Sequence, residues 1–185
     1  MTPFAHVAAG YLTTQIVDLL YPGLNFNSPG IIVTGIIAGN IPDLDFLVVK
    51  NKLHHRDTWT HAPIMWAVVI LVLLLIAKYL NNDTFFPYVL AFSLGVTSHF
   101  FTDWYAAREK DHGGIRLLYP FSKKHFGMLK LKEPLITEDK DFDLVKYAKY
   151  YMENAFLFYS EVVLIILGVV VFLSRSLSVF LGIFR

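Results

Sequence analysis

Long apolar segments separated by short polar ones make up most of this chain. Residues 62–80 form the clearest segment, because their only charge, Lys78, lies close enough to the end for its ammonium group to reach water. Residues 85–106 and 155–173 are similar in length and composition. Apolar stretches of this length can cross the hydrocarbon core of a bilayer as α-helices. The pattern therefore predicts three transmembrane helices.

Two further segments are apolar but are interrupted by polar residues. Residues 29–49 have the length of a span, and we expect it to break near Pro42. Residues 3–20 begin at a helix-start signal, because Thr2 can cap the helix and Pro3 suits its first position. This segment carries several polar side chains, so we expect it to pack inside the bundle. The five segments predict an all-α integral membrane helical bundle of four to five segments, forming a single domain over residues 1–185.

One sizeable polar insert interrupts this pattern. Residues 108–153 contain ten Lys or Arg residues and eight Asp or Glu residues. Within the insert, residues 141–151 place apolar side chains at helical spacing. We expect that part to be an amphipathic helix lying at the membrane interface.

The composition agrees with a membrane protein. The chain is 55% hydrophobic and 17% charged, and its mean hydropathy is +0.50. A net charge of +1 argues against nucleic acid as a partner held by bulk electrostatics. There is no cysteine, so a metal would have to be held by His, Asp, Glu or water.

The distribution of basic residues predicts the orientation. If the segments cross alternately, the N-terminus, the loop 43–61, the end of segment 85–106 and the insert share one side. Thirteen of the sixteen Lys and Arg residues then lie on that side. The positive-inside rule places it in the cytoplasm, with the chain crossing the membrane several times.

The most informative polar residues are His99 and Asp103, which lie four apart inside an apolar segment. Ionisable groups at membrane depth are expensive and usually functional. Their spacing puts both on one helix face, where they could reach one cation or where the carboxylate could orient the imidazole. A buried hydrogen bond that merely joins two helices is the alternative.

More candidate ligands stand near the ends of the segments, and parity places nearly all of them on the same side. With His99 and Asp103, the candidate metal ligands are His6, Asp45, His55, His61, His112 and Glu161. Taken alone, each has a simpler reading: the acids could be solvated at a helix end, and the histidines could lie in a solvated loop. Glu161 could also orient a helix or serve as a hydrogen-bonded packing residue.

These motifs, taken in order, resemble the YdjM-type family of predicted bacterial and archaeal inner-membrane metal-dependent hydrolases. The resemblance runs from residue 2 to about residue 125. The motifs that carry it are Thr2-Pro3 with His6, Gly39 to Asp45, His55-Arg56 with Thr60-His61, His99 with Asp103, and Leu118 to Ser122.

A more distant similarity connects the chain to the superfamily of zinc-dependent phospholipases C and single-strand nucleases, which hydrolyse phosphodiesters. It implies as ligands His6, Asp45, His61, His99 and Asp103. That superfamily has a later His-x-x-x-Glu pair, whereas here Leu157 lies four residues before Glu161. A site of one or two metals is therefore expected in place of a full cluster.

We predict a membrane-bound metal-dependent hydrolase acting on a phosphoester such as a lipid head group. The cofactor would be a divalent metal, zinc first, with manganese or magnesium as alternatives. Asp43 would act as general base and Arg56 would hold the phosphate, although Arg56 could equally be a solvated charge. The alternatives are an ion or small-solute transporter, which would spread ligands along the membrane depth, and a structural metal-binding scaffold with a closed coordination shell. The sequence does not specify an oligomeric state.

Overall fold

The predicted all-α bundle is present in the computed structural model, which describes residues 1–49, 58–81, 83–106, 114–128, 145, 148, 152 and 155–180. Within these residues the regular elements are all helices, and the sole β feature is an isolated bridge between Ile115 and Phe126. The α-helices are α1 (Pro3–Leu20), α2 (Pro29–Ala38), α3 (Pro63–Leu80), α4 (Phe85–Tyr105) and α6 (Ala155–Phe180). The short 3-10 helices are η1 (Pro22–Leu24), η2 (Ile41–Leu47) and η4 (Trp59–His61).

Three of these helices, α3, α4 and α6, are long and apolar enough to cross a membrane. The pair α2 and η2 makes a fourth candidate span, bent by 52° at the break predicted near Pro42. α1 is as long as α3, but it is not among the candidate membrane spans because polar side chains lower its hydropathy. It instead packs against α2, α4 and α6, with half of its residues buried, as expected for a segment inside the bundle.

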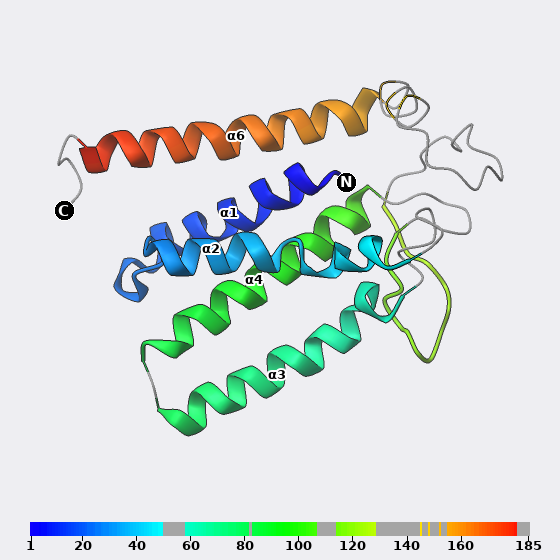
Figure 1. The fold of residues 1–185 in the computed structure, drawn as a ribbon, viewed down its shortest axis with the longest axis horizontal. Helices are drawn as coiled ribbons and strands as arrows, with labels where there is room; N and C mark the ends of the chain where they lie inside the picture. Colours follow the sequence, from blue (N-terminus) through cyan, green and yellow to red (C-terminus); the bar gives the residue numbers. More distant parts are fainter. Residues whose placement is uncertain are drawn as a thin grey trace.

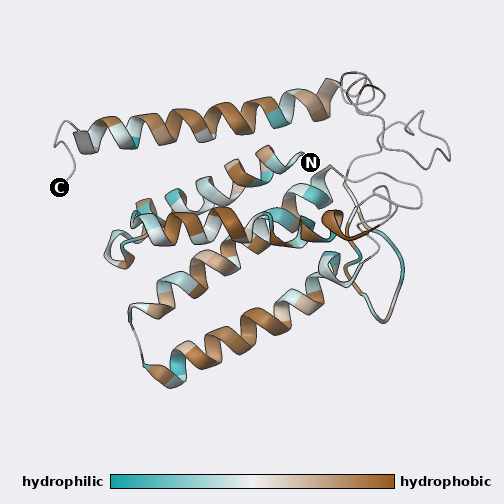
Figure 2. Ribbon diagram, viewed as in Figure 1, coloured by the Kyte–Doolittle hydropathy of each residue, from teal (hydrophilic) through white to brown (hydrophobic). Residues whose placement is uncertain are grey.

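The chain runs back and forth along the bundle, and this places distant segments at one end (Figure 1). The N-terminus, η2, η4 and residues 114–128, which we call the cap segment, all lie at that end. Figure 2 shows hydrophobic residues along most of α3 and α6, where few residues are buried inside the protein. Half of the α4 span is buried, and α4 is a central helix because it packs against α1, α2 and α3.

The helix ends follow local signals in the sequence. Thr2 caps α1 by accepting from the backbone N–H of Ala5 at 3.4 Å, and Pro3 occupies the first turn. α3 also begins at a proline and ends at Asn81, whose positive φ of 45° stops the helix. The predicted start of α1 is thus confirmed.

The central helices approach one another through glycines. The carbonyl oxygen of Gly35 in α2 lies 2.6 Å from where a Gly10 Cβ would be and is closer still to where a Gly95 Cβ would be. The carbonyl oxygen of His6 in α1 lies 2.9 Å from where a Cβ of Gly39 would be. Only residues without a side chain permit contacts this short. These contacts bring the backbones of α1, α2 and α4 together next to the polar end of the bundle.

The amphipathic helix expected at residues 141–151 lies largely outside the described residues. Val145 and Ala148 are described, and both are helical.

Candidate metal centre

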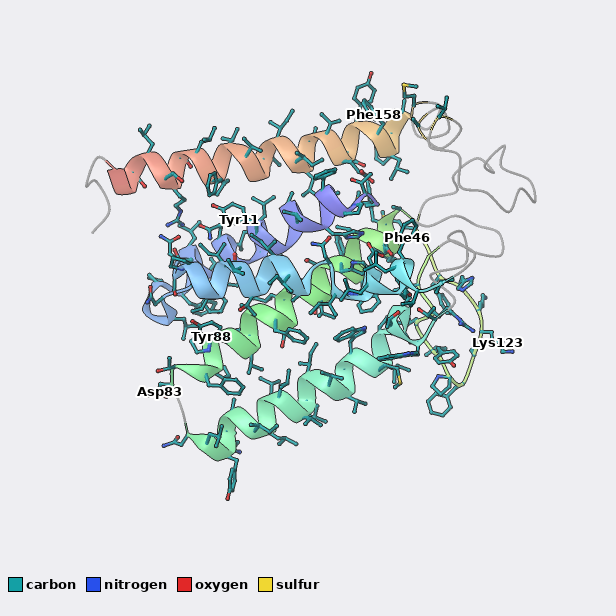
Figure 3. The ribbon with its side chains drawn as sticks, viewed as in Figure 1. Tyr11, Phe46, Asp83, Tyr88, Lys123 and Phe158 are labelled. Carbon is teal, nitrogen blue, oxygen red and sulfur yellow. The ribbon has the colours of Figure 1, made fainter. Side chains whose placement is uncertain are left out.

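Four predicted residues come together at the end of the bundle where η2, η4 and α4 meet. Each of Asp43, His61, His99 and Asp103 offers one ligand atom, and these atoms all lie within 4.8 Å of one another. They come from three elements, so no single stretch of sequence contains the group. Figure 3 shows Phe46 of η2 at the same end of the bundle as Lys123 of the cap segment. We call Asp43, His61, His99 and Asp103 the metal-ligand group.

His99 is oriented by a backbone carbonyl at the break after α2. Its Nδ1 lies 2.9 Å from the carbonyl oxygen of Gly39. A carbonyl can only accept, so Nδ1 carries the hydrogen and Nε2 presents a lone pair. Nε2 is buried, has no hydrogen-bond partner among the described residues, and lies 3.6 Å from Asp103 Oδ2 and 3.9 Å from Asp43 Oδ1. A lone pair facing two carboxylates is unfavourable without a cation between them, so these residues fit a bound metal ion.

His6 lies beside the group in a similar state. Its ring stacks on the ring of His99 with centroids 4.1 Å apart, and its Nδ1 lies 2.9 Å from the hydroxyl of Thr102. When that hydroxyl donates its single proton to a backbone carbonyl of α4, it accepts from His6 Nδ1. In that tautomer the Nε2 of His6 carries a lone pair, and it lies 3.6 Å from Asp43 Oδ2 and 3.5 Å from Asp103 Oδ1. His6 is thus placed as a fifth candidate ligand.

Asp43 and Asp45 contact opposite sides of the His61 ring. Asp45 Oδ2 lies 2.9 Å from His61 Nδ1 and also accepts from the hydroxyls of Thr58 and Thr60, so Asp45 stands behind the imidazole. The Nε2 of His61 points the other way, 3.1 Å from Asp43 Oδ1. The structure therefore places Asp43 in the metal-ligand group, with Asp45 orienting His61. A carboxylate in that position fixes the tautomer of a metal-binding histidine and raises its basicity.

The metal-ligand group carries a strong negative charge for a buried site. The side chain of Asp103 is fully buried and that of Asp43 is 18% exposed. The amino group of Met1 donates to Asp103 Oδ1 at 3.0 Å, which puts a positive charge against one of these carboxylates. Burial alone would lower the pKa of His61, but its hydrogen bonds with Asp43 and Asp45 outweigh burial and raise this pKa. The excess of carboxylates favours a divalent cation.

Glu161 lies outside the metal-ligand group. Its two oxygens accept from the backbone N–H of Thr2 at 3.0 Å and from the hydroxyl of Thr2 at 2.7 Å. These bonds join α6 to the first turn of α1. The contacts fit the alternative in which this acid orients a helix.

Three other predicted site residues, His55, Arg56 and His112, lie outside the described residues. Their roles as ligands and as phosphate clamp stay predictions.

The sequence interpretation missed the groups that support the ligands. Thr58 and Thr102, with the carbonyl of Gly39, hold Asp45, His6 and His99 in place. Thr102 lies between His99 and Asp103, and this position was the one sign in the sequence that it belongs to the site. The other contacts cross between elements and leave no local pattern.

The fold and the site define a helical membrane protein with a buried His/Asp group that could hold a metal ion. The chain matches the YdjM inner membrane protein family over residues 1–179, and it belongs to that family. The resemblance seen in the motifs is thus confirmed. No curated protein and no solved structure matches the chain.

Proposed function

We propose that this protein is a membrane-bound metal-dependent hydrolase that acts on a phosphoester. The observation that carries the proposal is the metal-ligand group, in which the buried Nε2 of His99 faces the carboxylates of Asp43 and Asp103 without a hydrogen-bond partner among the described residues. Mixed imidazole and carboxylate ligands suit zinc first, with manganese or magnesium as alternatives. When bound, such an ion polarises a phosphoryl oxygen and lowers the pKa of a water molecule that it binds.

The residues of the site have different proposed roles. His61, His99 and Asp103 hold the ion together with Asp43, and His6 completes the set. Asp43 is the one member whose side chain is partly exposed, so substrate and water approach from its side. Its carboxylate would accept a proton from the attacking water.

The depth of the group supports a lipid head group as the substrate. His99 and Asp103 lie six and two residues before Tyr105, the last residue of α4. At a rise of about 1.5 Å per residue, these positions are roughly 9 Å and 3 Å from the helix end. That depth corresponds to the boundary between head groups and acyl chains. The asymmetry of Lys and Arg residues supports a multi-pass orientation with this end in the cytoplasm.

One observation favours transport as a second candidate function. Toward the other end of the bundle, Asp18 forms an ion pair with Arg175 of α6 at 3.2 Å. Gln15 is 4% exposed, and both polar atoms of its side chain lack a hydrogen-bond partner among the described residues. Polar groups thus extend away from the metal-ligand group along α1, as the path of an ion would require. Metal-dependent flux into proteoliposomes would favour this function.

The decisive experiment uses the full chain, purified in detergent without chelators. Elemental analysis should find a divalent metal, and a screen of phosphomonoesters, phosphodiesters and phospholipids should find hydrolysis that His99→Ala removes. Metal without hydrolysis would favour a structural scaffold or a transporter. An absence of bound metal would refute the proposal.

A further inference from the structure

The protein surface beside the metal-ligand group is apolar. The sequence of η2 is Ile-Pro-Asp-Leu-Asp-Phe-Leu, so its only polar side chains are the two aspartates of the site. Leu47 at its end is 75% exposed, and the following Val48 is 80% exposed. η4 packs against η2 and adds an exposed tryptophan. The exposed apolar side chains of these two elements, which we call the apolar rim, are Leu44, Phe46, Leu47, Val48 and Trp59.

The geometry of η2 places the apolar rim next to the open side of the metal-ligand group. A 3-10 helix has three residues per turn, so residues three apart share one face. Asp43, the partly exposed member of the group, therefore shares a face with Phe46, which is also exposed at this end of the bundle (Figure 3). Leu44 and Leu47 share the neighbouring face. A molecule that reaches the Asp43 carboxylate thus passes beside apolar side chains.

The apolar rim continues a surface that faces the membrane. α2 and η2 together form one candidate span, and α2 exposes Val33 and Ile37. Exposed apolar side chains therefore follow this span up to the metal-ligand group. Leucine and valine side chains are unfavourable in water but not among acyl chains, and an exposed tryptophan suits the membrane interface. An exposed apolar surface that adjoins a binding site is typical of contact with a membrane or an apolar ligand.

We propose that the apolar rim binds the hydrocarbon chain of the substrate, which is a phosphorylated lipid that reaches the metal centre sideways from the bilayer, along η2. This inference rests on the proposed function and narrows it, because a water-soluble phosphoester has no chain to place on the rim. The phosphate reaches Asp43 and the ion, while the part of the chain next to the phosphate lies against Leu44 and Leu47. The rest of the chain stays in the bilayer.

A series of alkylphosphonates tests the chain contact, because a carbon–phosphorus bond resists hydrolysis. Calorimetric titration of the metal-loaded full chain should show affinity that rises from ethyl- through butyl- to hexylphosphonate, by about two- to fourfold for each methylene group.

Truncation of the rim should remove this dependence on chain length. The double variant Leu44→Ala with Leu47→Ala should weaken hexylphosphonate binding by at least about fivefold, and should leave ethylphosphonate binding unchanged because neither leucine touches the phosphate. The matched control is Val33→Ala with Ile37→Ala, which truncates two exposed apolar side chains of the same candidate span, away from η2. The control should keep the wild-type dependence, and both double variants should keep the wild-type metal content.

Equal affinity of the wild type for ethyl- and hexylphosphonate would overturn the inference and leave the proposed function standing. An equal loss of both affinities in the rim variant, or the same loss in the control, would also overturn it. Wild type that holds no metal, or that binds no phosphonate when loaded with metal, would refute the proposed function itself. If the rim variant does not fold, Trp59→Ala replaces it: weaker binding of hexylphosphonate alone would support the inference, and unchanged binding would contradict it.

Discussion

The imidazole of His99 donates through Nδ1 to the carbonyl oxygen of Gly39, 2.9 Å away and sixty residues earlier in the chain. This bond couples the central helix α4 to the break between α2 and η2. If Gly39 were inside a continuous helix, its carbonyl oxygen would accept from the backbone N–H four residues later and would not be available to His99. The break therefore orients a metal ligand as well as redirecting the chain toward Asp43.

Replacing His99 or Asp103 with alanine should remove metal binding. Each offers a buried atom to the same ion, so we expect a loss of affinity greater than about 100-fold, beyond that typical for supporting residues. The helix should still insert, because its apolar contacts and internal hydrogen bonds are intact. Elemental analysis of the purified variants measures this, with His125→Ala of the cap segment as the control that should retain metal. Full metal content in either ligand variant would contradict the site.

Asp43→Ala and Asp45→Ala should differ in severity. Asp43 belongs to the metal-ligand group, so its loss should abolish binding. Asp45 holds His61 through Nδ1 and should cost roughly 10- to 100-fold in metal affinity. Titration with a competing chelator gives both values. A larger loss in Asp45→Ala than in Asp43→Ala would support the prediction from the sequence that Asp45 is a ligand.

Gly95→Ala should destabilise the bundle and disturb the metal centre. The added methyl group would meet Ala38 Cβ at 2.7 Å and the Gly35 carbonyl oxygen at a still shorter distance. Overpacking of this kind costs about 1–3 kcal/mol. The apparent melting temperature and the metal content should both fall. Gly23→Ala is the matched control, because nothing lies within 4 Å of its added Cβ and both quantities should stay unchanged.

Metal affinity should rise with pH. In the metal-free protein the pKa of His61 is raised above its usual 6.5, so its pairing with Asp43 and Asp45 stabilises the fold below that value. This stabilisation is lost as the pH rises through the raised pKa. A metal ion needs the neutral imidazole, so below the raised pKa its affinity should increase about tenfold per pH unit. Dissociation constants measured across this window test the sign, and a flat profile would show that no proton is displaced.

The end of the bundle with the metal centre should face the cytoplasm. Lys123 and Asp83 lie at opposite ends of the bundle (Figure 3), and the chain contains no cysteine. Single cysteines at these two positions should therefore react with an impermeant maleimide from opposite sides. Labelling of the Lys123 variant in intact cells, from the periplasm, would reverse the orientation.

The sequence by itself determined the helical segments, the break near Pro42 and the shared face of His99 and Asp103. These features depend on hydrophobic length, on the lack of an N–H in proline and on a spacing of one helical turn, all of which are local. The family resemblance added the combination of motifs, which no single segment carries.

Only the tertiary structure decided which polar residues meet. Asp43 and Asp45 lie two apart in one short helix, and the bend of 52° together with the packing of η4 decides which of them faces the other ligands. Glu161 bonds to Thr2, 159 residues away, so no local pattern could assign it to the helix contact. The helical repeat decides which side chains share one face of a helix. The relative position of two helices depends instead on how closely their backbones pack. Here glycines that leave no room for a side chain set that distance.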